Sequence, residues 1–243
     1  MDPRIKGIEI KLSDVSRIIP VVSGKGGVGK SMISTTLALA LSRMGYSVGL
    51  LDLDFHGASD HIILGFHPEG FPEEEKGVIP PLIHGIKFMS IVFYTENRAI
   101  PLRGREISDA LVEILSITRW DSLDYLIVDM PPGLGEQFLD LLRYIPRGEY
   151  LLVATPSPLS ANVASKVLDI LREGGYSILG LVENMGNGTL KEFSNNAGVN
   201  YLGNIGFHPT LDSIIGEPEK LLASEFGREV KSIADKIADI TGL

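Results

Sequence analysis

A glycine-rich run with two lysines is the clearest chemical signature in this sequence. Residues 24–31 read GKGGVGKS and match the pattern G-x-x-x-x-G-K-[ST]. Glycines let backbone N–H groups converge on an anion, and the positive end of a following helix adds to the attraction. We therefore predict a phosphate-binding loop in which Lys30 contacts the β- and γ-phosphates and Ser31 binds Mg²⁺. The predicted nucleotide-binding residues of this loop are Gly24, Lys25, Gly26, Gly27, Val28, Gly29, Lys30, Ser31 and Met32.

Carboxylates end two later apolar runs. Asp52 and Asp54 lie in the run Val48–Phe55, and Asp129 follows the apolar residues Tyr125–Val128. In open α/β sheets, ligands bind in the crevice outside the carboxyl ends of the strands. We expect Asp129 to hold Mg²⁺, directly or through water, and Asp54 to orient and deprotonate the attacking water. Asp52 is expected to support the loop or the metal shell, and a capping or turn role is the alternative for both Asp52 and Asp54.

A stiff turn comes directly after Asp129. The sequence Met130-Pro131-Pro132 is followed by Gly133, whose N–H is predicted to contact a γ-phosphate. Such a contact exists only in the triphosphate state, so the turn is suited to switching.

Alternating strand and helix patterns must position these residues. The predicted strands are Ile18–Ser23, Val48–Phe55, Ile86–Val92, Asp124–Asp129, Tyr150–Ala154, Ile178–Asn184 and Tyr201–Ile205, and the predicted helices are Lys30–Met44, 105–118, 135–144, 160–173 and 219–241. This alternation predicts a doubly wound, mostly parallel α/β sheet flanked by helices, in one domain spanning residues 1–243.

Two segments need separate interpretation. Residues 56–81 contain four prolines and the acidic run Glu73-Glu74-Glu75, which predicts a long mobile surface loop. The helix over 219–241 has an apolar stripe, but its polar face mixes acidic and basic residues, whereas a membrane-surface helix is dominated by Lys and Arg. We expect it to pack on the domain.

Composition excludes several classes of function. The 243 residues carry 22 Lys and Arg against 31 Asp and Glu, a net charge of −9, and no cysteine. Disulfides, cysteine nucleophiles, thiolate zinc sites and iron–sulfur clusters on the chain's own thiols are therefore excluded. The acidic balance argues against nucleic-acid or anionic-membrane binding. No apolar run reaches the length of a membrane span, and the N-terminus has no apolar core of signal-peptide length, so we expect a cytoplasmic protein.

The second lysine of the loop carries a family resemblance. With Lys25 inside GKGGVGKS, the loop resembles the deviant Walker A loop of the ParA/MinD/NifH-like ATPases. The resemblance implies that Lys25 contacts the nucleotide on a partner subunit and neutralises charge as the γ-phosphoryl group departs, as an arginine finger does. Asp54, 24 residues after Lys30, matches the water-activating aspartate of that superfamily.

Further motifs resemble the Mrp/ApbC branch of this superfamily. They are Pro101–Gly104, Arg119–Gly133, Asp54–Ser59, Glu183-Asn184-Met185 and Leu202–Pro209, and they span nearly the whole chain. The resemblance implies a nucleotide-dependent homodimer connected with iron–sulfur cluster assembly or transfer. It also implies that Asn184 hydrogen-bonds the adenine edge and that His208 and Pro209 pack beside the base.

The chain departs from the branch where the cargo is expected. Family members with carrier activity place C-x-x-C after the Glu-Asn-Met segment, whereas Gly186–Ser194 contains no thiolate here. Gly133–Glu136 reads GLGE in place of the branch's GTGD. We therefore expect a switch ATPase that binds and hydrolyses Mg-ATP as a homodimer. It would serve cluster assembly only with a separate scaffold or a protein client.

Three alternatives remain at this stage. A ParA/MinD-like positioning ATPase on DNA or membrane requires a basic patch or basic tail, which this acidic chain does not show. A metallochaperone NTPase would use His56, His61 and His67 with Asp54 and Asp60, although their spacing matches no helix-face or hairpin ligand pattern. In a small-molecule kinase, Lys25 would have no role.

Overall fold

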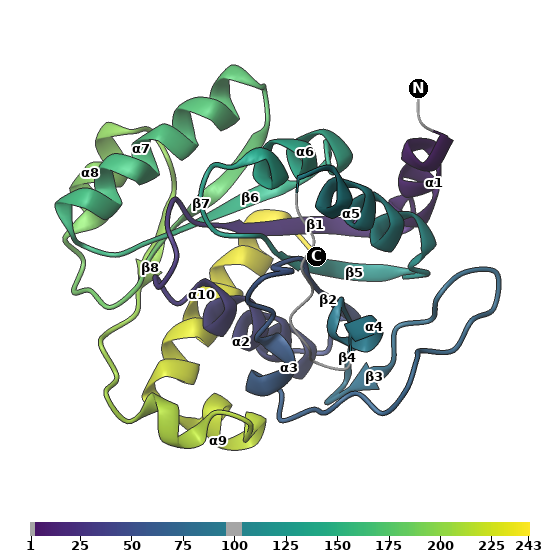
Figure 1. Ribbon diagram of the computed structural model, residues 1–243. Helices are drawn as coiled ribbons and strands as arrows, with labels where there is room; N and C mark the ends of the chain where they lie inside the picture. Colours follow the sequence, from purple (N-terminus) through teal and green to yellow (C-terminus); the bar gives the residue numbers. More distant parts are fainter. Residues whose placement is uncertain (1–2, 96–103) are drawn as a thin grey trace.

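One eight-stranded sheet forms the centre of the molecule. The computed structural model describes residues 3–95 and 104–243 (Figure 1). The strands are β1 (Val15–Val22), β2 (Val48–Asp52), β3 (Leu82–Ile83), β4 (Ile86–Ser90), β5 (Leu123–Asp129), β6 (Glu149–Ala154), β7 (Ser177–Glu183) and β8 (Tyr201–Asn204). Their order is β3-β4-β2-β5-β1-β6-β7-β8, and each neighbouring pair is parallel except the short antiparallel pair β3–β4. The predicted doubly wound, mostly parallel α/β fold is confirmed.

Helices cover both faces of the sheet, so its central strands are buried on both sides. The helices are α1 (Pro3–Leu12), α2 (Lys30–Arg43), α3 (Asp60–Ile63), α4 (Val92–Thr95), α5 (Arg105–Ile117), α6 (Glu136–Tyr144), α7 (Pro158–Glu173), α8 (Leu190–Asn196), α9 (Pro218–Ala223) and α10 (Glu225–Thr241), with a 3₁₀ turn at Leu211–Ile214. In Figure 1, α5, α6 and α7 lie over one face, and α2 and α10 lie over the other. Because neither face is solvated, the central parts of β1 (18–22) and β5 (125–128) are continuous apolar runs rather than alternating ones.

Strand register brings the carboxylates together. In the parallel ladders, Asp129 pairs with Asp52 of β2 on one side and with Val21 of β1 on the other. The loop that joins β1 to α2 therefore begins beside the two carboxylate-bearing strand ends. This single edge of the sheet positions the glycine-rich loop and both aspartates.

Several elements differ from the prediction. α1, α8 and the edge strand β3 were not predicted, because α1 is a short helix stabilised by packing on α5 and β3 has only two residues. The single helix expected over 219–241 is two helices. They divide at Ser224, whose hydroxyl accepts a hydrogen bond from the Gly227 N–H at 3.0 Å and so begins α10.

The segment predicted as a long loop, residues 56–81, contains ordered parts. It includes α3, and Val78 within it is buried and hydrogen-bonded to Ile117 and Arg119, at 2.8 Å in each case. The contact of Val78 with Ile117 and Arg119 could not be predicted from the sequence, because a single buried residue in a proline-rich segment has no periodic pattern. Of the motif Pro101–Gly104, residues 101–103 lie outside the described part of the chain.

Substitution of Gly49 in β2 tests how tightly side chains pack at the centre of the sheet. A Cβ at this position would lie 2.8 Å from both Leu123 and Trp120. Gly49→Ala is therefore expected to lower the free energy of unfolding by about 2 kcal/mol through overpacking. Denaturant unfolding should show this loss, whereas Gly135→Ala, where no atom lies within 4 Å of the added carbon, is the control. Equal stability of the two variants would contradict the packing argument.

Candidate functional site

The glycine-rich loop forms a candidate anion site at the start of α2. Gly27 and Gly29 adopt φ of +76° and +80°, a region that disfavours other residues. A Cβ at Gly29 would lie 2.2 Å from Nδ2 of Asn184, and one at Gly24 would lie 2.4 Å from Cγ1 of Val163. Gly29 caps the 14-residue α2 without a side chain, so the first N–H groups of the helix remain available to an anion.

A cavity of about 420 Å³ opens over this loop. It is lined by residues 25–32 together with Ser23, Asp54, Ser59, Ile62, Ile63, Pro132 and Ile215. The structure thus brings the predicted loop residues and Asp54 to one cavity, whose volume falls within the range of small-molecule sites.

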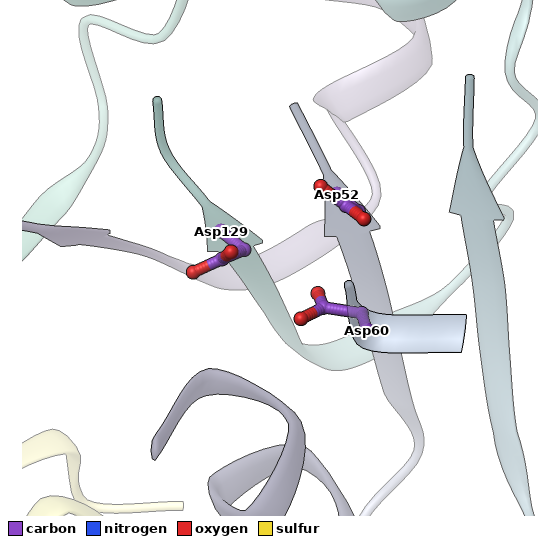
Figure 2. Close-up of side chains that lie close together, drawn as sticks. All are labelled: Asp52, Asp60 and Asp129. Carbon is purple, nitrogen blue, oxygen red and sulfur yellow. The ribbon is translucent and has the colours of Figure 1, made fainter. Parts of the chain in front are cut away.

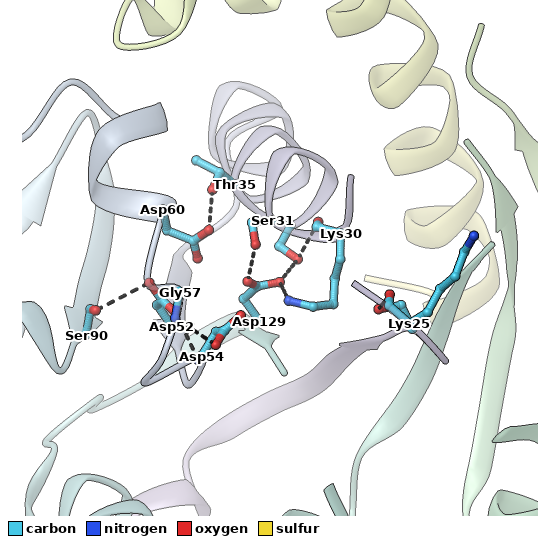
Figure 3. A network of polar contacts seen from close by, with 12 residues as sticks. Lys25, Lys30, Ser31, Thr35, Asp52, Asp54, Gly57, Asp60, Ser90 and Asp129 are labelled. Carbon is cyan, nitrogen blue, oxygen red and sulfur yellow. Dashed lines mark hydrogen bonds and ion pairs between the residues drawn. The ribbon is translucent and has the colours of Figure 1, made fainter. Parts of the chain in front are cut away.

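Three side chains of α2 converge on Asp129 (Figure 3). The Lys30 ammonium forms an ion pair with Asp129 Oδ1 at 2.7 Å, and both side chains are buried. Ser31 donates to Oδ2 at 2.7 Å, and Ser34 donates to Oδ1 at 2.6 Å. Ser31 and Asp129, the two predicted Mg²⁺ ligands, are therefore in direct contact. The sequence analysis did not identify Ser34, although it lies one turn after Lys30 on the same helix.

Three buried carboxylates meet in this place (Figure 2). Oxygen atoms of Asp52, Asp60 and Asp129 lie within 4.8 Å of one another, and each residue is at most 1% exposed. Asp60 begins α3 and accepts a hydrogen bond from Thr35 of α2 at 2.9 Å. The sequence analysis missed this role, because Asp60 falls in the segment interpreted as a surface loop.

Burial and mutual repulsion shift the titration of this cluster. Burial, and then the charge of Asp129, raises the pKa of Asp52 to about 7. Burial, Asp129 and Asp52 raise the pKa of Asp60 well above its ordinary value. Burial alone would lower the pKa of Lys30, but the attraction of Asp129, supplemented by Asp60 and Asp52, raises it.

Asp54 and Lys25 occupy different positions around the cavity. Asp54 is half-buried, its N–H donates to Asp52 at 3.1 Å, and its carboxylate accepts from the Gly57 N–H at 3.0 Å. The half-buried Lys25 side chain points away from Asp129 (Figure 3), so within one chain the two loop lysines do not share a partner.

Gly133 lies beside the loop but its N–H is engaged. It has φ of +85° and donates to the Ser23 carbonyl at 3.0 Å. The predicted contact of this N–H with a γ-phosphate therefore competes with an existing hydrogen bond.

Asn184, His208 and Pro209 line a second cavity of about 280 Å³, which also contacts Gly29 and Met32 of the loop. Asn184 is buried, and its amide donates to the Val28 carbonyl at 2.7 Å, so it holds the phosphate loop itself. His208 contacts Glu229 at 2.7 Å. The structure places all three residues next to the loop, and Asn184 has a loop-positioning contact that the sequence did not reveal.

Glu183, directly before Asn184, is a further residue that sequence reasoning missed. Its buried carboxylate accepts hydrogen bonds from the backbone N–H groups of Asn187, Gly188, Thr189 and Leu190 at 2.8–3.2 Å and from the Tyr201 hydroxyl at 2.9 Å. This carboxylate organises the segment in which the Mrp/ApbC branch has its cysteines. A glutamate at the end of a buried strand was the available signal.

The three loop histidines do not form a metal-binding group. His61 is fully buried in α3, His56 is exposed, and His67 lines a separate groove. Within residues 3–95 and 104–243, Asp52, Asp60 and Asp129 are the only set of three or more His, Cys, Asp or Glu close enough to share an ion. In the same part of the chain, no helix is long and apolar enough to span a membrane.

The sheet order and the glycine-rich loop between β1 and α2 define a P-loop NTPase fold. The chain superposes on the ADP complex of a nucleotide-binding protein from Archaeoglobus fulgidus with a TM-score of 0.80 and 28% identity, covering 93% of this chain and 96% of that one. It also shares the fold of the Mg-ADP complex of the septum site-determining protein MinD from Pyrococcus horikoshii, with a TM-score of 0.70 and 22% identity over 93% and 97% of the two chains.

Residues 14–241 match the ParA family described as NUBPL iron-transfer P-loop NTPase, and the chain belongs to this family. It is 34% identical to the iron-sulfur cluster carrier protein of Saccharolobus solfataricus, over 96% of this chain and 86% of that protein. It is 40% identical to the protein of the same name from Pseudomonas fragi, over 72% of this chain and 62% of that relative, which is less than two thirds of the relative's length. The resemblance to the Mrp/ApbC type is confirmed.

The raised pKa of Asp52 predicts a pH dependence of stability. Its pKa is about 7 when folded against an ordinary 3.8, so on raising the pH the unfolded chain loses this proton first. The resulting stabilisation is complete at low pH and is lost as the pH rises through about 7. Between pH 4 and pH 7, Asp52→Asn should therefore gain about 3 kcal/mol of stability relative to wild type, at about 1.4 kcal/mol per pKa unit.

Urea unfolding of ligand-free protein across this pH range measures the effect. Asp239→Asn, at an exposed position of α10, is the control for loss of one carboxylate. A pH profile of Asp52→Asn that runs parallel to that of wild type would show that the cluster does not retain this proton.

Proposed function

We propose that this protein is a homodimeric switch that binds and hydrolyses Mg-ATP. The observation that carries the proposal is the convergence of Lys30 and Ser31, at the start of α2, on Asp129 at the end of β5. The ADP complex of the similar A. fulgidus protein supports nucleotide binding by this fold. The proposed nucleotide site comprises residues 24–32 with Gly133, and its base side comprises Asn184, His208 and Pro209.

The donor set fits magnesium. The Ser31 hydroxyl and the Asp129 carboxylate are hard oxygen ligands 2.7 Å apart, next to the helix N-terminus that would receive the phosphates. When bound, Mg²⁺ neutralises charge on the phosphates. The Lys30 ammonium lies beside the same carboxylate. When nucleotide binds, the Lys30 side chain would exchange its contact with Asp129 for one with a β- or γ-phosphate.

Asp54 and Lys25 are the proposed catalytic groups that complete the site. Asp54 lines the cavity at the end of a turn fixed by its contacts with Asp52 and Gly57, from which its carboxylate orients water and accepts a proton. Lys25 points away from Asp129 of its own chain, as a residue serving a second subunit would. Its ammonium neutralises charge on the partner's γ-phosphate.

The proposed cellular role is accessory to iron–sulfur cluster assembly in the cytoplasm. Two relatives are named iron-sulfur cluster carrier protein, yet this chain has no cysteine with which to bind a cluster. We propose that the ATP cycle controls the binding of a separate scaffold or client protein that carries the thiols. Asp54→Ala should retain ATP and remain dimeric. A pull-down with this variant tests which protein the ATP-bound dimer binds.

Mixing two inactive variants tests the trans role of Lys25. Lys25→Ala and Asp54→Ala should each bind ATP but hydrolyse it slowly, whereas Lys30→Ala should lose nucleotide binding. In an equal mixture, half of the dimers contain one subunit of each variant. If Lys25 acts across the dimer, each mixed dimer has one intact site, which combines Asp54 of the Lys25→Ala subunit with Lys25 of the other. About a quarter of the wild-type rate should therefore return. Phosphate release after ATP-dependent dimer exchange measures it.

Two results would contradict this arrangement. Recovery no greater than the sum of the separate variants would place Lys25 in its own subunit's site or outside catalysis. Normal hydrolysis by Asp54→Ala would remove Asp54 from the reaction.

Reconstitution tests the consequence of the missing cysteines. Anaerobic incubation of the purified chain with iron and sulfide should leave no cluster after desalting, because no thiolate is present to bind iron. The absorption spectrum and iron content report the result. A stable brown protein with stoichiometric iron would show that other side chains bind the cluster.

A further inference from the structure

A second depression lies beside the edge of the sheet, away from the nucleotide site. It is a groove of about 840 Å³ between β3 and the segment that precedes it, and it shares no lining residue with the two cavities described above. Its apolar lining includes Phe66, Phe71, Ile79, Pro80, Leu82 and Phe93. In Figure 1 this segment extends outward next to β3 and α4.

The floor of the groove is an aromatic cluster that holds its shape. The ring centroids of Phe66, Phe88 and Phe93 lie 5.7–6.3 Å from one another, with Phe88 fully buried below the other two. The outer wall is fixed by a backbone hydrogen bond from the Ile79 N–H to the Glu73 carbonyl at 2.8 Å. The groove is therefore formed before any partner arrives, which reduces the ordering cost of binding.

Two large apolar side chains of this groove are left in solvent. Phe71 is 75% exposed and Leu82 is 70% exposed. Both line the groove, so their exposed surfaces are continuous with its apolar floor. A contiguous exposed apolar patch of this kind, in contrast to scattered single residues, marks an interaction site.

The charges around the groove are acidic and unbalanced. Glu69 and Glu73 line it and are exposed, and neither forms an ion pair with any residue of the described ranges 3–95 and 104–243. The lysine of the groove, Lys87, donates to the Trp120 carbonyl at 2.6 Å and contacts Asp121 at 3.4 Å, so its charge is already compensated. The uncompensated charge facing a partner is negative.

We propose that this groove docks a protein segment in which Lys or Arg residues flank aromatic or aliphatic side chains. The apolar side chains of the segment cover Phe71 and Leu82 and fill the groove above Phe66 and Phe93. Its basic residues lie against Glu69 and Glu73, which contribute selectivity and faster association rather than most of the affinity. This inference is independent of ATP hydrolysis, because the groove contains no residue of the nucleotide site.

Fluorescence anisotropy with three short peptides tests the proposal on the full chain. The peptides have equal aromatic and aliphatic content and carry Lys, Gln or Glu at the flanking positions. The Lys peptide should bind at least about tenfold more tightly than the Glu peptide, and rising salt should narrow this difference. Phe71→Ser and Leu82→Ser should each weaken the Lys peptide by about tenfold, the size of a central interface contact.

Matched control substitutions distinguish binding in the groove from non-specific binding to other apolar or acidic surfaces. Ile10→Ser on α1 removes an apolar side chain that is 63% exposed elsewhere, and Glu192→Gln removes an exposed carboxylate of α8, so both should leave peptide affinity unchanged. Glu69→Gln with Glu73→Gln should weaken only the Lys peptide and reduce its salt dependence. Because Phe71 and Leu82 are exposed, these variants should keep the unfolding midpoint of wild type.

Three outcomes would overturn the proposal. Equal affinity for the three peptides, or no binding of any, would exclude a basic apolar partner. Equal loss of affinity in Ile10→Ser would place binding elsewhere. A change of oligomeric state in Phe71→Ser, measured by sedimentation without nucleotide, would show that the groove is covered by a second copy of this chain.

Discussion

The Lys30–Asp129 ion pair compensates a charge imbalance on which the nucleotide site depends. Three buried carboxylates lie within 4.8 Å of one another, and the Lys30 ammonium forms an ion pair with one of them, Asp129. Buried charges of one sign are strongly unfavourable unless they are paired or protonated. Burial and this repulsion raise the pKa values of Asp52 and Asp60, because a protonated carboxyl is easier to bury and repels its neighbours less. In the ligand-free state, Lys30 therefore stabilises the ends of β2 and β5, where these carboxylates lie.

In the proposed function, this charge arrangement would couple phosphate binding to cation binding. A phosphate that attracted Lys30 would remove the ammonium that pairs with Asp129 and leave the carboxylate cluster without that compensation. In the proposed function, Ser31 and Asp129 would hold a divalent ion that restores the charge balance, so each ligand would improve the site for the other. The coupling requires no large motion, since the Ser31 hydroxyl already lies 2.7 Å from Asp129. It also extends to Asp54, whose N–H is hydrogen-bonded to Asp52 of the same cluster.

The sequence was sufficient to predict the parts of this site that local patterns specify. The loop 24–31, the apolar strand before Asp129 and the order of strands and helices follow from glycine spacing and hydrophobic runs, and the fold class was predicted correctly. Asp60 was not predicted as a buried polar residue because its burial results from a tertiary contact, whereas Glu183 had a signal, its place at the end of a buried strand, that the sequence analysis did not use. Asp60 is buried through Thr35 of α2, and Glu183 through four backbone N–H groups that follow it. Single polar residues that pair at a distance have no periodicity.

Glu183 explains how the chain maintains the loop after β7 without metal or thiols. A buried carboxylate that accepts five hydrogen bonds is well compensated, since each donor stabilises its charge. The same residue precedes Asn184, which holds the Val28 carbonyl of the phosphate loop at 2.7 Å. The segment without cysteines is thus rigid and joined to the nucleotide site through adjacent residues. Its order therefore depends on hydrogen bonds within this chain, and a cluster is not required to fold the loop after β7.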